Sequence, residues 1–161
     1  MEFILHKRGS DELKIVIDGD GCPVIKIVEK IACEYQIELI VVCDVNHYLK
    51  LDYGIVKIVD QGNDQVDYEI LKLIQKDDLV ITQDYGLASL VLAKKGKALN
   101  QNGIEYHQNN IDAMLFSRYV GVKLKNSKNK THLKGPKKRT REDDEHFKQA
   151  LIKMLHDKQL H

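Results

Sequence analysis

Aspartates stand where several apolar segments of the chain end, and carboxylates grouped in this way can bind a divalent cation. Asp18 ends the first apolar run, and Asp20 follows in the loop just beyond it. Asp84 comes two residues after the fourth run, and Asp64 and Asp67 open the helix expected before that run. Grouped carboxylates raise one another's pKa unless a cation relieves them, and Mg²⁺ and Mn²⁺ favour oxygen ligands. The pattern predicts a Mg²⁺ or Mn²⁺ site held by Asp18, Asp64, Asp67 and Asp84, with Asp18, Asp20 and Asp84 as the candidate catalytic residues.

Each aspartate taken singly also has a structural interpretation. Asp64 and Asp67 could cap a helix, where acids are favoured, and Asp84 could cap the next one. Asp44 follows the second apolar run and favours a turn. Asp18 is harder to explain in this way, because a carboxylate directly after Ile-Val-Ile is expected to be half-buried and to need a partner. The set as a whole therefore points to a metal site more strongly than any single aspartate does.

The elements that would position these side chains alternate between strands and helices. Apolar runs predict strands at residues 14–18, 37–43, 55–59, 79–82 and 97–99. Helical spacing occurs at residues 23–35, from Asp64 onward, around 87–91 and around 111–119, and Thr140 with Asp143 resembles a capping box before a helix at 142–157. Such apolar strands separated by helices predict an α/β fold, in which helices flank a central, mostly parallel sheet on both faces. The carboxyl ends of its strands would share one edge, where ligands bind.

The chain length of 161 residues suits a single domain at residues 14–161. Residues 1–13 show no sustained periodicity and are expected to form a flexible N-terminal extension. No apolar run approaches the ~18 residues of a membrane span. The three cysteines, Cys22, Cys33 and Cys43, lack CxxC spacing, which disfavours a disulfide framework and predicts reduced thiols in the cytoplasm.

A basic segment at residues 121–141 is predicted to be a loop. Between Lys123 and Arg141 lie nine cations and no acid, whereas the rest of the chain carries an excess of acids. A basic segment on an acidic body can contact a phosphate backbone, although a loop kept soluble by lysines has the same composition. The candidate nucleic-acid-binding residues are Lys125, Lys128, Lys130, Lys134, Lys137, Lys138 and Arg139.

Three residues near the strand ends, Cys22, Thr82 and Asn100, are expected to support the metal ligands rather than to bind the ion. Cys22 lies near the expected N-terminus of a helix, whose dipole would lower the pKa of the thiol. No His or Asn nearby in the sequence makes a persuasive partner for a nucleophile, so the supporting role is favoured. His47 follows the second strand, where it could face the crevice, although a surface position is favoured.

The segment Ile17–Val24, with the sequence I-D-G-D-G-C-P-V, resembles the start of the YaiI/YqxD family of bacterial proteins. In that family a strand is followed by D-x-D-x-C-P-V. The similarity extends over about residues 14–157 and includes further motifs in the family's order and spacing. They are G-N-D-Q-V-D at 62–67, D-D-L-V-I-T-Q-D at 77–84, G-L-A at 86–88, A-L-N at 98–100, K-G-P at 134–136, and Asp144 with Phe147.

This family is in turn similar to the PIN-domain superfamily. That resemblance implies a three-layer α/β fold and, as in many PIN domains, Mg²⁺- or Mn²⁺-dependent ribonuclease activity. It implies that Asp18 matches the first-strand acid, and that Asp64 or Asp67 matches the acid that opens the helix before the fourth strand. Asp84 matches the acid of the strand-T-x-D motif of PIN domains.

These observations leave three functions open. The first is a divalent-metal-dependent nuclease that hydrolyses phosphodiester bonds, in RNA rather than DNA, with a water activated by the cation as nucleophile. The second is a non-catalytic domain that binds RNA or a protein, because the further helix acid of PIN nucleases has only weak counterparts here, Glu29 and Asp44. The third is a HAD-like phosphatase with Asp18 as nucleophile and Asp20 as acid and base, although Cys22 stands where a Thr is usual. The expected partner is a nucleic acid rather than a membrane, and the oligomeric state stays open, a homodimer included.

Overall fold

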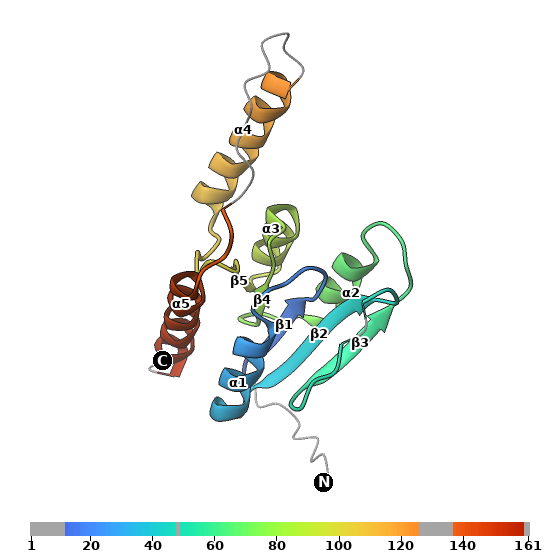
Figure 1. Ribbon diagram of the computed structural model, residues 1–161, viewed down its shortest axis with the longest axis vertical. Coiled ribbons are helices and arrows are strands. Elements are labelled where there is room, and N and C mark those ends of the chain that lie inside the picture. The colour runs from blue at the N-terminus through green and yellow to red at the C-terminus, as the bar shows by residue number, and fades with distance from the viewer. Residues whose placement is uncertain (1–11, 48, 126–136, 160–161) are drawn as a thin grey trace.

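The computed structural model describes residues 12–47, 49–125 and 137–159 of the chain. Within these ranges the elements follow in the order β1 (Lys14–Asp18), α1 (Ile25–Tyr35), β2 (Glu38–Asp44), β3 (Ile55–Val59), α2 (Gln65–Leu73), β4 (Leu79–Ile81), α3 (Tyr85–Ala93), β5 (Lys97–Leu99), α4 (Gln108–Lys125) and α5 (Arg141–Gln159). Figure 1 labels them along the ribbon. None of the helices in these ranges has the length and apolar character required to span a membrane.

The five strands form one parallel sheet in the order β3-β2-β1-β4-β5, which confirms the predicted parallel arrangement. β1 lies at the centre, where Ile15 pairs with Leu39 of β2 on one side and with Leu79 of β4 on the other. The chain adds β2 and β3 on one side of β1 and then crosses over to add β4 and β5 on the other. The strand order therefore reverses between β1 and β4, and ligands bind at such a point beyond the carboxyl ends of the strands.

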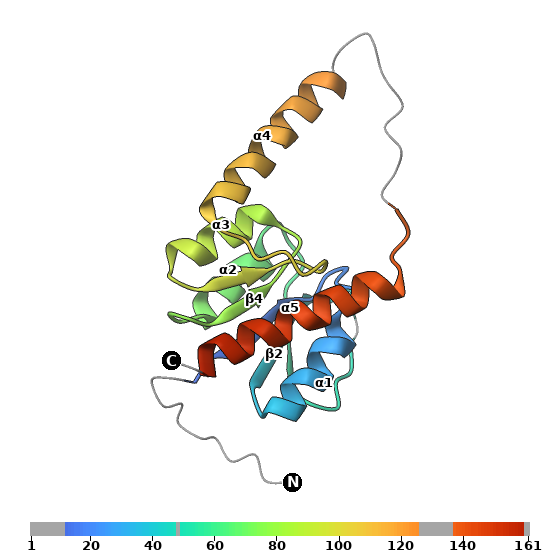
Figure 2. The same cartoon turned by 90° about the vertical axis from the view of Figure 1, so that its left-hand side faces the viewer.

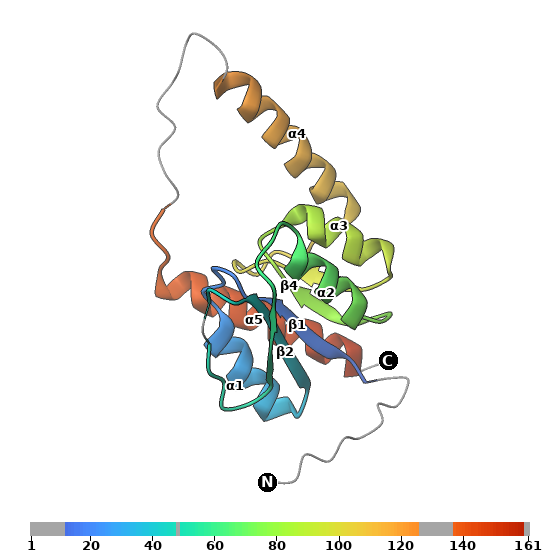
Figure 3. The same cartoon turned by 90° about the vertical axis from the view of Figure 1, so that its right-hand side faces the viewer.

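Alternate side chains of the strands feed two separate cores, because successive residues of a strand point to opposite faces. On one face Ile15, Ile17, Leu39, Val41, Leu79, Ile81 and Leu99 pack with residues of α1 and α5. On the other face Val16, Ile40, Val42, Val80 and Ala98 pack with residues of α2, α3 and the first turns of α4. Figures 2 and 3 show these two helical layers from opposite sides. The expected three-layer α/β fold, with helices on both faces of the sheet, is therefore present.

Several element boundaries differ from the sequence prediction, and two of these differences affect the predicted segments most. Helix α4 continues through Lys125, so residues 121–125 of the predicted basic loop are helical. The reason is that the strong helix-breaking residues come later, and Gly121 costs only about 1 kcal/mol in a helix. At the other boundary Leu13 packs against the core beneath α1 and α5, although it belongs to the predicted extension. The remainder of that extension, residues 1–11, lies outside the described residues.

Helix α5 begins at the predicted capping box. The backbone N–H of Thr140 donates to Asp143 Oδ2 at 2.8 Å, and the N–H of Asp143 donates back to Thr140 Oγ1 at 3.3 Å. These reciprocal bonds satisfy backbone donors that the first turn of a helix leaves free. They fix the point at which the chain returns to the domain, so α5 can place Phe147, Leu151 and Leu155 against the sheet.

Candidate metal centre

Thr82 connects two of the candidate aspartates across the central strands. Its buried hydroxyl donates to Asp18 Oδ2 at 2.9 Å and accepts from the backbone N–H of Asp84 at 3.0 Å. The hydroxyl of Tyr106 donates in turn to the carbonyl oxygen of Thr82 at 3.1 Å. The end of β1 and the loop after β4 are therefore held in one fixed relation.

The turn that carries Asp20 depends on a glycine. Gly19 donates its backbone N–H to the carbonyl oxygen of Val42 at 2.8 Å. A Cβ atom at Gly19 would come within 2.8 Å of Val41 Cγ1 and 2.9 Å of the Val42 carbonyl oxygen, so a larger residue would push the turn away from β2. Gly21, with φ of 74°, completes the turn in a conformation that glycine adopts readily. Asp20 is thereby brought back over the ends of β1 and β2.

Asp84 caps helix α3, as its structural interpretation predicted. Its Oδ1 atom accepts from the backbone N–H groups of Gly86 and Leu87 at 2.8 and 3.2 Å. These cap bonds hold the carboxylate at the helix N-terminus, where the helix dipole favours a negative charge. Only Oδ1 takes part in them, so capping and metal binding by Oδ2 are compatible.

Asp64 and Asp67 approach the same edge from helix α2. Asp64 precedes the helix in the left-handed region, with φ of 65°, and its side chain makes no cap hydrogen bond. Burial, followed by the charges of Asp84, Asp18 and Asp64, raises the pKa of Asp67 to about 6. The charges of Asp18, Asp64 and Asp84 therefore all act on Asp67.

Asp18 has a shifted pKa for related reasons. Burial raises the pKa of Asp18, the hydrogen bond from Thr82 lowers it, and the charges of Asp20 and Asp84 raise it further. In the described part of the chain, no Lys or Arg forms an ion pair with Asp18, Asp67 or Asp84. The repulsion within this group is therefore not relieved by a protein cation.

A small pocket of about 20 Å³ opens beside Asp18, which is room for one water molecule. Its walls are Asp18, Asp20, Cys22, Ile81, Thr82, Gln83 and Gln101. The Oε1 atom of Gln101 is buried and has no hydrogen-bond partner among the described residues. A buried oxygen of this kind requires a donor, because leaving it unpaired costs about 1–3 kcal/mol. The pocket therefore presents an acceptor as well as carboxylates.

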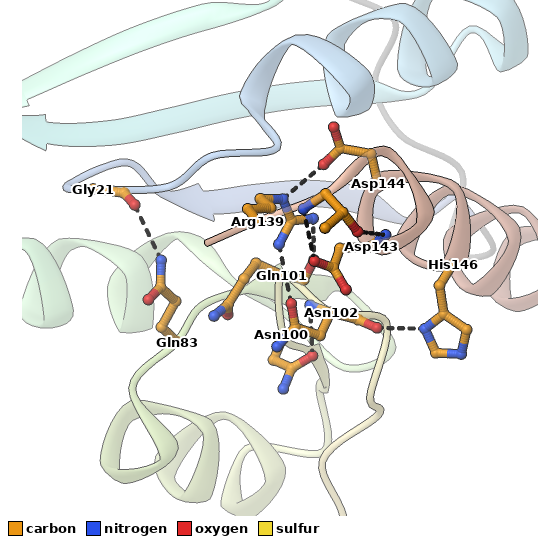
Figure 4. Close-up of polar contacts among 10 residues, drawn as sticks. Gly21, Gln83, Asn100, Gln101, Asn102, Arg139, Asp143, Asp144 and His146 are labelled. Carbon is orange, nitrogen blue, oxygen red and sulfur yellow. Dashed lines mark hydrogen bonds and ion pairs between the residues drawn. The ribbon is translucent and has the colours of Figure 1, made fainter. Parts of the chain in front are cut away.

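Arg139 fastens the start of α5 to the loop that carries Gln101 (Figure 4). Its Nη2 donates to the Gln101 carbonyl oxygen at 2.7 Å, its Nη1 to Asn102 Oδ1 at 3.0 Å, and its Nε to Asp144 Oδ1 at 2.6 Å. On the opposite side of the pocket, Gln83 Nε2 donates to the carbonyl oxygen of Gly21 at 3.0 Å. Arg139, which was predicted from the sequence to contact nucleic acid, uses three N–H groups in these bonds to protein atoms.

The sequence predicted a lowered pKa for the Cys22 thiol, and this prediction is wrong. Burial raises the pKa of Cys22 to about 11, and the charge of Arg139 lowers it only in part. The helix dipole does not prevail, since α1 begins only at Ile25. Cys22 is a protonated thiol in the pocket wall at neutral pH.

Asn100 supports a loop and does not line the pocket. Its Oδ1 accepts from the backbone N–H groups of Asn102 and Ile104, both at 2.9 Å. These bonds shape the turn after β5 that presents Gln101. Glu29, one weak counterpart of the further PIN acid, is engaged far from the pocket, where its Oε2 accepts from the N–H groups of Asp52 and Tyr53.

A second acidic group lies at the end of β2, beside the first. Asp20, Asp44 and His47 each offer one ligand atom, and these atoms lie within 4.8 Å of one another. His47 Nδ1 stands 2.8 Å from Asp44 Oδ1 and 3.2 Å from Asp20 Oδ1. The hydrogen bond to Asp44 raises the pKa of His47, and the same bond lowers the pKa of Asp44. Among the described residues, no trio drawn from Asp18, Asp64, Asp67 and Asp84 brings its oxygens this close.

The predicted cations are distributed unevenly around this edge. Lys137 and Lys138 are exposed just before α5. Lys125 is the last residue of α4. Lys128, Lys130 and Lys134 lie outside the described residues.

Comparison with known proteins identifies the family. The sequence profile described as "Uncharacterized BCR, YaiI/YqxD family" matches residues 16–157. The chain belongs to the YaiI/YqxD family. It is 43% identical over 143 residues to a UPF0178 protein of Clostridium acetobutylicum, a match that covers 89% of this chain and 97% of the relative. It is 41% identical over 146 residues to a UPF0178 protein of Exiguobacterium sibiricum, covering 91% and 99% of the two chains.

The match to the YaiI/YqxD family confirms the resemblance found at Ile17–Val24 and in the later motifs. Among solved structures, the chain resembles Rae1 (YacP) from Bacillus subtilis (W164L mutant), with a TM-score of 0.42 and 15% sequence identity. That alignment covers 70% of this chain and 82% of the other. A similarity this low transfers no activity from one protein to the other.

Two residues of the site were not found from the sequence, and a third, His47, was favoured as a surface residue. Gln83 and Gln101 line the pocket, and His47 joins Asp20 and Asp44. Gln101 comes two residues after β5 and so lies at the same sheet edge as the aspartates. Residues that follow parallel strands gather at one edge of the sheet. If amide and histidine side chains at such positions are considered together with carboxylates, all three residues are identified as candidates.

Proposed function

We propose that this protein is a divalent-metal-dependent nuclease that hydrolyses phosphodiester bonds, with RNA as its substrate. The observation that carries the proposal is the link through Thr82 between Asp18 and Asp84, with Asp67 close enough for both to raise its pKa. The proposal is supported by the positions of Asp18 and Asp84 at the ends of β1 and β4, between which the strand order reverses, and in the described residues no Lys or Arg forms an ion pair with these carboxylates. A divalent cation would relieve their repulsion.

The donor set fits Mg²⁺ or Mn²⁺. Asp18, Asp67 and Asp84 would hold the ion with Asp64 nearby, and carboxylate oxygens are the ligands that both ions favour. The unpartnered Gln101 Oε1 agrees with a hydrated site, since it offers an acceptor to a water in the pocket. When bound, such a cation supplies an activated water and offsets the negative charge that develops on the phosphate.

The remaining roles belong to residues of the chain itself. Thr82 fixes the orientation of the Asp18 carboxylate through its hydrogen bond to Oδ2. Asp20 stands between Asp18 and His47, where its carboxylate is placed to orient a water or to hold a second ion together with Asp44. Gln101 Oε1 is placed to accept a hydrogen bond from that water or from a substrate hydroxyl.

The surroundings of the pocket suit a polyanionic substrate. Lys137 and Lys138 are exposed next to Arg139, which is bonded to the backbone of the pocket residue Gln101. Cations at this position would contact the phosphate backbone, so substrate affinity should fall steeply as salt rises. The resemblance to PIN domains agrees with RNA as the substrate class.

The test measures Mn²⁺-stimulated cleavage of a single-stranded RNA by the wild type and by Asp84→Asn, purified identically. We expect cleavage to fall at least about 100-fold in the variant, because a ligand of the cation is lost. Asp60→Asn is the matched control, since this exposed residue follows β3 at the same sheet edge and its charge is not among those that shift Asp67. Equal activity of Asp84→Asn and the wild type would refute the role of Asp84.

Two outcomes would select the other functions. RNA binding at two salt concentrations, with no heat of Mn²⁺ binding in calorimetry, would identify a non-catalytic binding domain. A beryllofluoride adduct at Asp18 would identify the phosphatase, in which this carboxylate accepts the phosphoryl group.

A further inference from the structure

Helix α4 presents an exposed stripe made of Phe116, Tyr119, Val120 and Lys123. Their spacing of three, four and seven residues places them on one side of the helix. Phe116 is 68% exposed and Tyr119 60% exposed, whereas Ile111 on the other side of the helix is buried in the core. Figures 1 and 3 show that the helix leaves the layered body and that its C-terminal half stands clear of it. These aromatic rings therefore face solvent rather than another part of the described chain.

The charge around the stripe is of one sign. Lys123 Nζ lies 5.5 Å from the centre of the Tyr119 ring, a cation–π contact. From Ala113 to Arg141 the sequence contains ten Lys and Arg residues and no acid. A surface that combines exposed aromatic rings with cations is complementary to a strand that carries flat bases on a phosphate backbone.

A side chain from the second half of α4 reaches back to the body next to the candidate metal centre. Arg118 places its guanidinium 5.7 Å from the centre of the Tyr85 ring. Tyr85 follows Asp84 directly and is the first residue of α3. A strand lying along the stripe would therefore be delivered toward the edge where Asp84 and Asp18 meet.

We propose that this stripe binds single-stranded RNA, with bases stacked on Phe116 and Tyr119 and phosphates beside Lys123. The choice of RNA rests on the proposed nuclease function, and the stacking surface rests on the structure of α4. A second copy of the chain is a poorer occupant, because two such surfaces would bring together like charges without an intervening acid. A polyanion gains from the same charges.

The first experiment measures binding without cleavage. The full-length protein carrying Asp18→Asn is titrated in EDTA against a fluorescein-labelled 15-nucleotide oligo(A) RNA, and anisotropy gives Kd. Adding Phe116→Ala and Tyr119→Ala should raise Kd at least about tenfold, because each base stack on an aromatic ring contributes substantially. The conservative pair Phe116→Tyr and Tyr119→Phe should keep the affinity. Tyr68→Ala is the matched control, because Tyr68 is 61% exposed but lies on α2 between Asp67 and Glu69.

The second experiment observes the stack directly. The chain contains no Trp, so Phe116→Trp introduces a single indole reporter. Its fluorescence should be quenched when oligo(A) is added, and that of Tyr68→Trp should not change. Lys123→Ala should reduce the slope of log K against log salt by about 0.7, while the aromatic substitutions should leave the slope unchanged.

Three results would overturn the inference. One is a Kd for the double alanine variant equal to that of its parent. Another is displacement of the RNA by polyglutamate as effectively as by unlabelled RNA, since charge alone would then explain binding. The third is light scattering that shows a dimer broken by the two alanine substitutions with RNA affinity intact.

Hydrolysis of bis(p-nitrophenyl) phosphate in Mn²⁺ separates this inference from the proposed function, since that diester has no strand that could lie along the stripe while its phosphate occupies the pocket. Stripe-dependent RNA binding without such hydrolysis would remove the nuclease and keep the stacking surface. Hydrolysis of the diester, together with RNA binding that does not depend on the stripe, would keep the nuclease proposal and remove the stacking surface.

Discussion

Two acidic groups lie side by side at the carboxyl edge of the sheet, and they are neutralised in different ways. Asp18, Asp67 and Asp84 are partly buried or tied to backbone groups, and burial and mutual repulsion raise the pKa values of Asp18 and Asp67. Asp44, in the second group, has a lowered pKa, because His47 bonds to its carboxylate. Among the described residues no Lys or Arg forms an ion pair with the first group, whereas Asp44 of the second group pairs with His47. Under the proposed function, uncompensated charge rather than close spacing of ligand atoms marks the ion site.

The largest expected difference between the groups is in Mn²⁺ affinity. Asp18→Asn should weaken Mn²⁺ binding about 100-fold or more, because it removes a carboxylate from the uncompensated group. His47→Ala should weaken it less than about tenfold, since the second group is at most an auxiliary site. Calorimetry on both variants at pH 7.5 gives the two affinities. Equal losses would place the ion between Asp20, Asp44 and His47 instead.

A smaller effect is expected when the link between the aspartates is removed. Thr82→Val should lower the free energy of unfolding by about 2 kcal/mol, because it removes a donor to the Asp18 carboxylate and an acceptor for the part-buried N–H group of Asp84. The pKa of Asp18 should rise further, since the Thr82 hydroxyl lowers it. Urea unfolding in EDTA measures the first effect, and Thr82→Ser, which keeps the hydroxyl, serves as the control. If Val and Ser behave alike, the hydroxyl contributes nothing to stability.

The repulsion within the first group should appear in the pH dependence of stability. The folded pKa of Asp67 is about 6, above its ordinary value of 3.8, so the folded protein binds more protons than the unfolded chain between these values. Metal-free stability should therefore fall as pH rises from about 4 to about 6, by roughly 1 kcal/mol after solvent screening. Asp67→Asn should remove this part of the slope and be the more stable protein at pH 7 in EDTA. Parallel pH profiles for the two proteins would contradict the assignment.

The smallest effect concerns His47. Its pKa is raised above 6.5 by Asp44 and Asp20, so the pair stabilises the fold below pH 6.5 and this contribution is lost as pH rises through the folded pKa. His47→Ala should lower the melting temperature slightly at pH 5.5 and leave it unchanged at pH 9. The difference should shrink in high salt, because the pair is exposed. A larger loss at pH 9 than at pH 5.5 would mean that His47 acts through packing.

The sequence permitted a correct prediction of the layers and the parallel sheet, because each strand is a short apolar run with helical spacing after most of them. The placement of Asp18 and Asp84 at one edge follows from that reasoning, since both come at strand ends.

The properties of side chains that depend on burial could not be predicted from the sequence. The thiol of Cys22 has a raised pKa because the residue is largely buried, and α1 begins only three residues later, at Ile25. In the sequence, Arg139 is one of several neighbouring cations, and nothing there distinguishes its role from that of the lysines. In the structure its planar guanidinium donates hydrogen bonds to other residues of the protein.

The contacts of Arg139 and Asn100 have a consequence for how the chain could be altered. Both ends of the excursion that contains α4 are pinned to the domain, at the turn after β5 and at the start of α5. A long insertion with fixed ends is shortened at little entropic cost, because closure entropy varies only with the logarithm of its length. Tyr106 and Ile111 between these anchors are buried in the core, and Tyr106 bonds to Thr82. The part of α4 beyond Met114 could therefore be trimmed or exchanged between relatives while the sheet and its acidic edge keep their geometry.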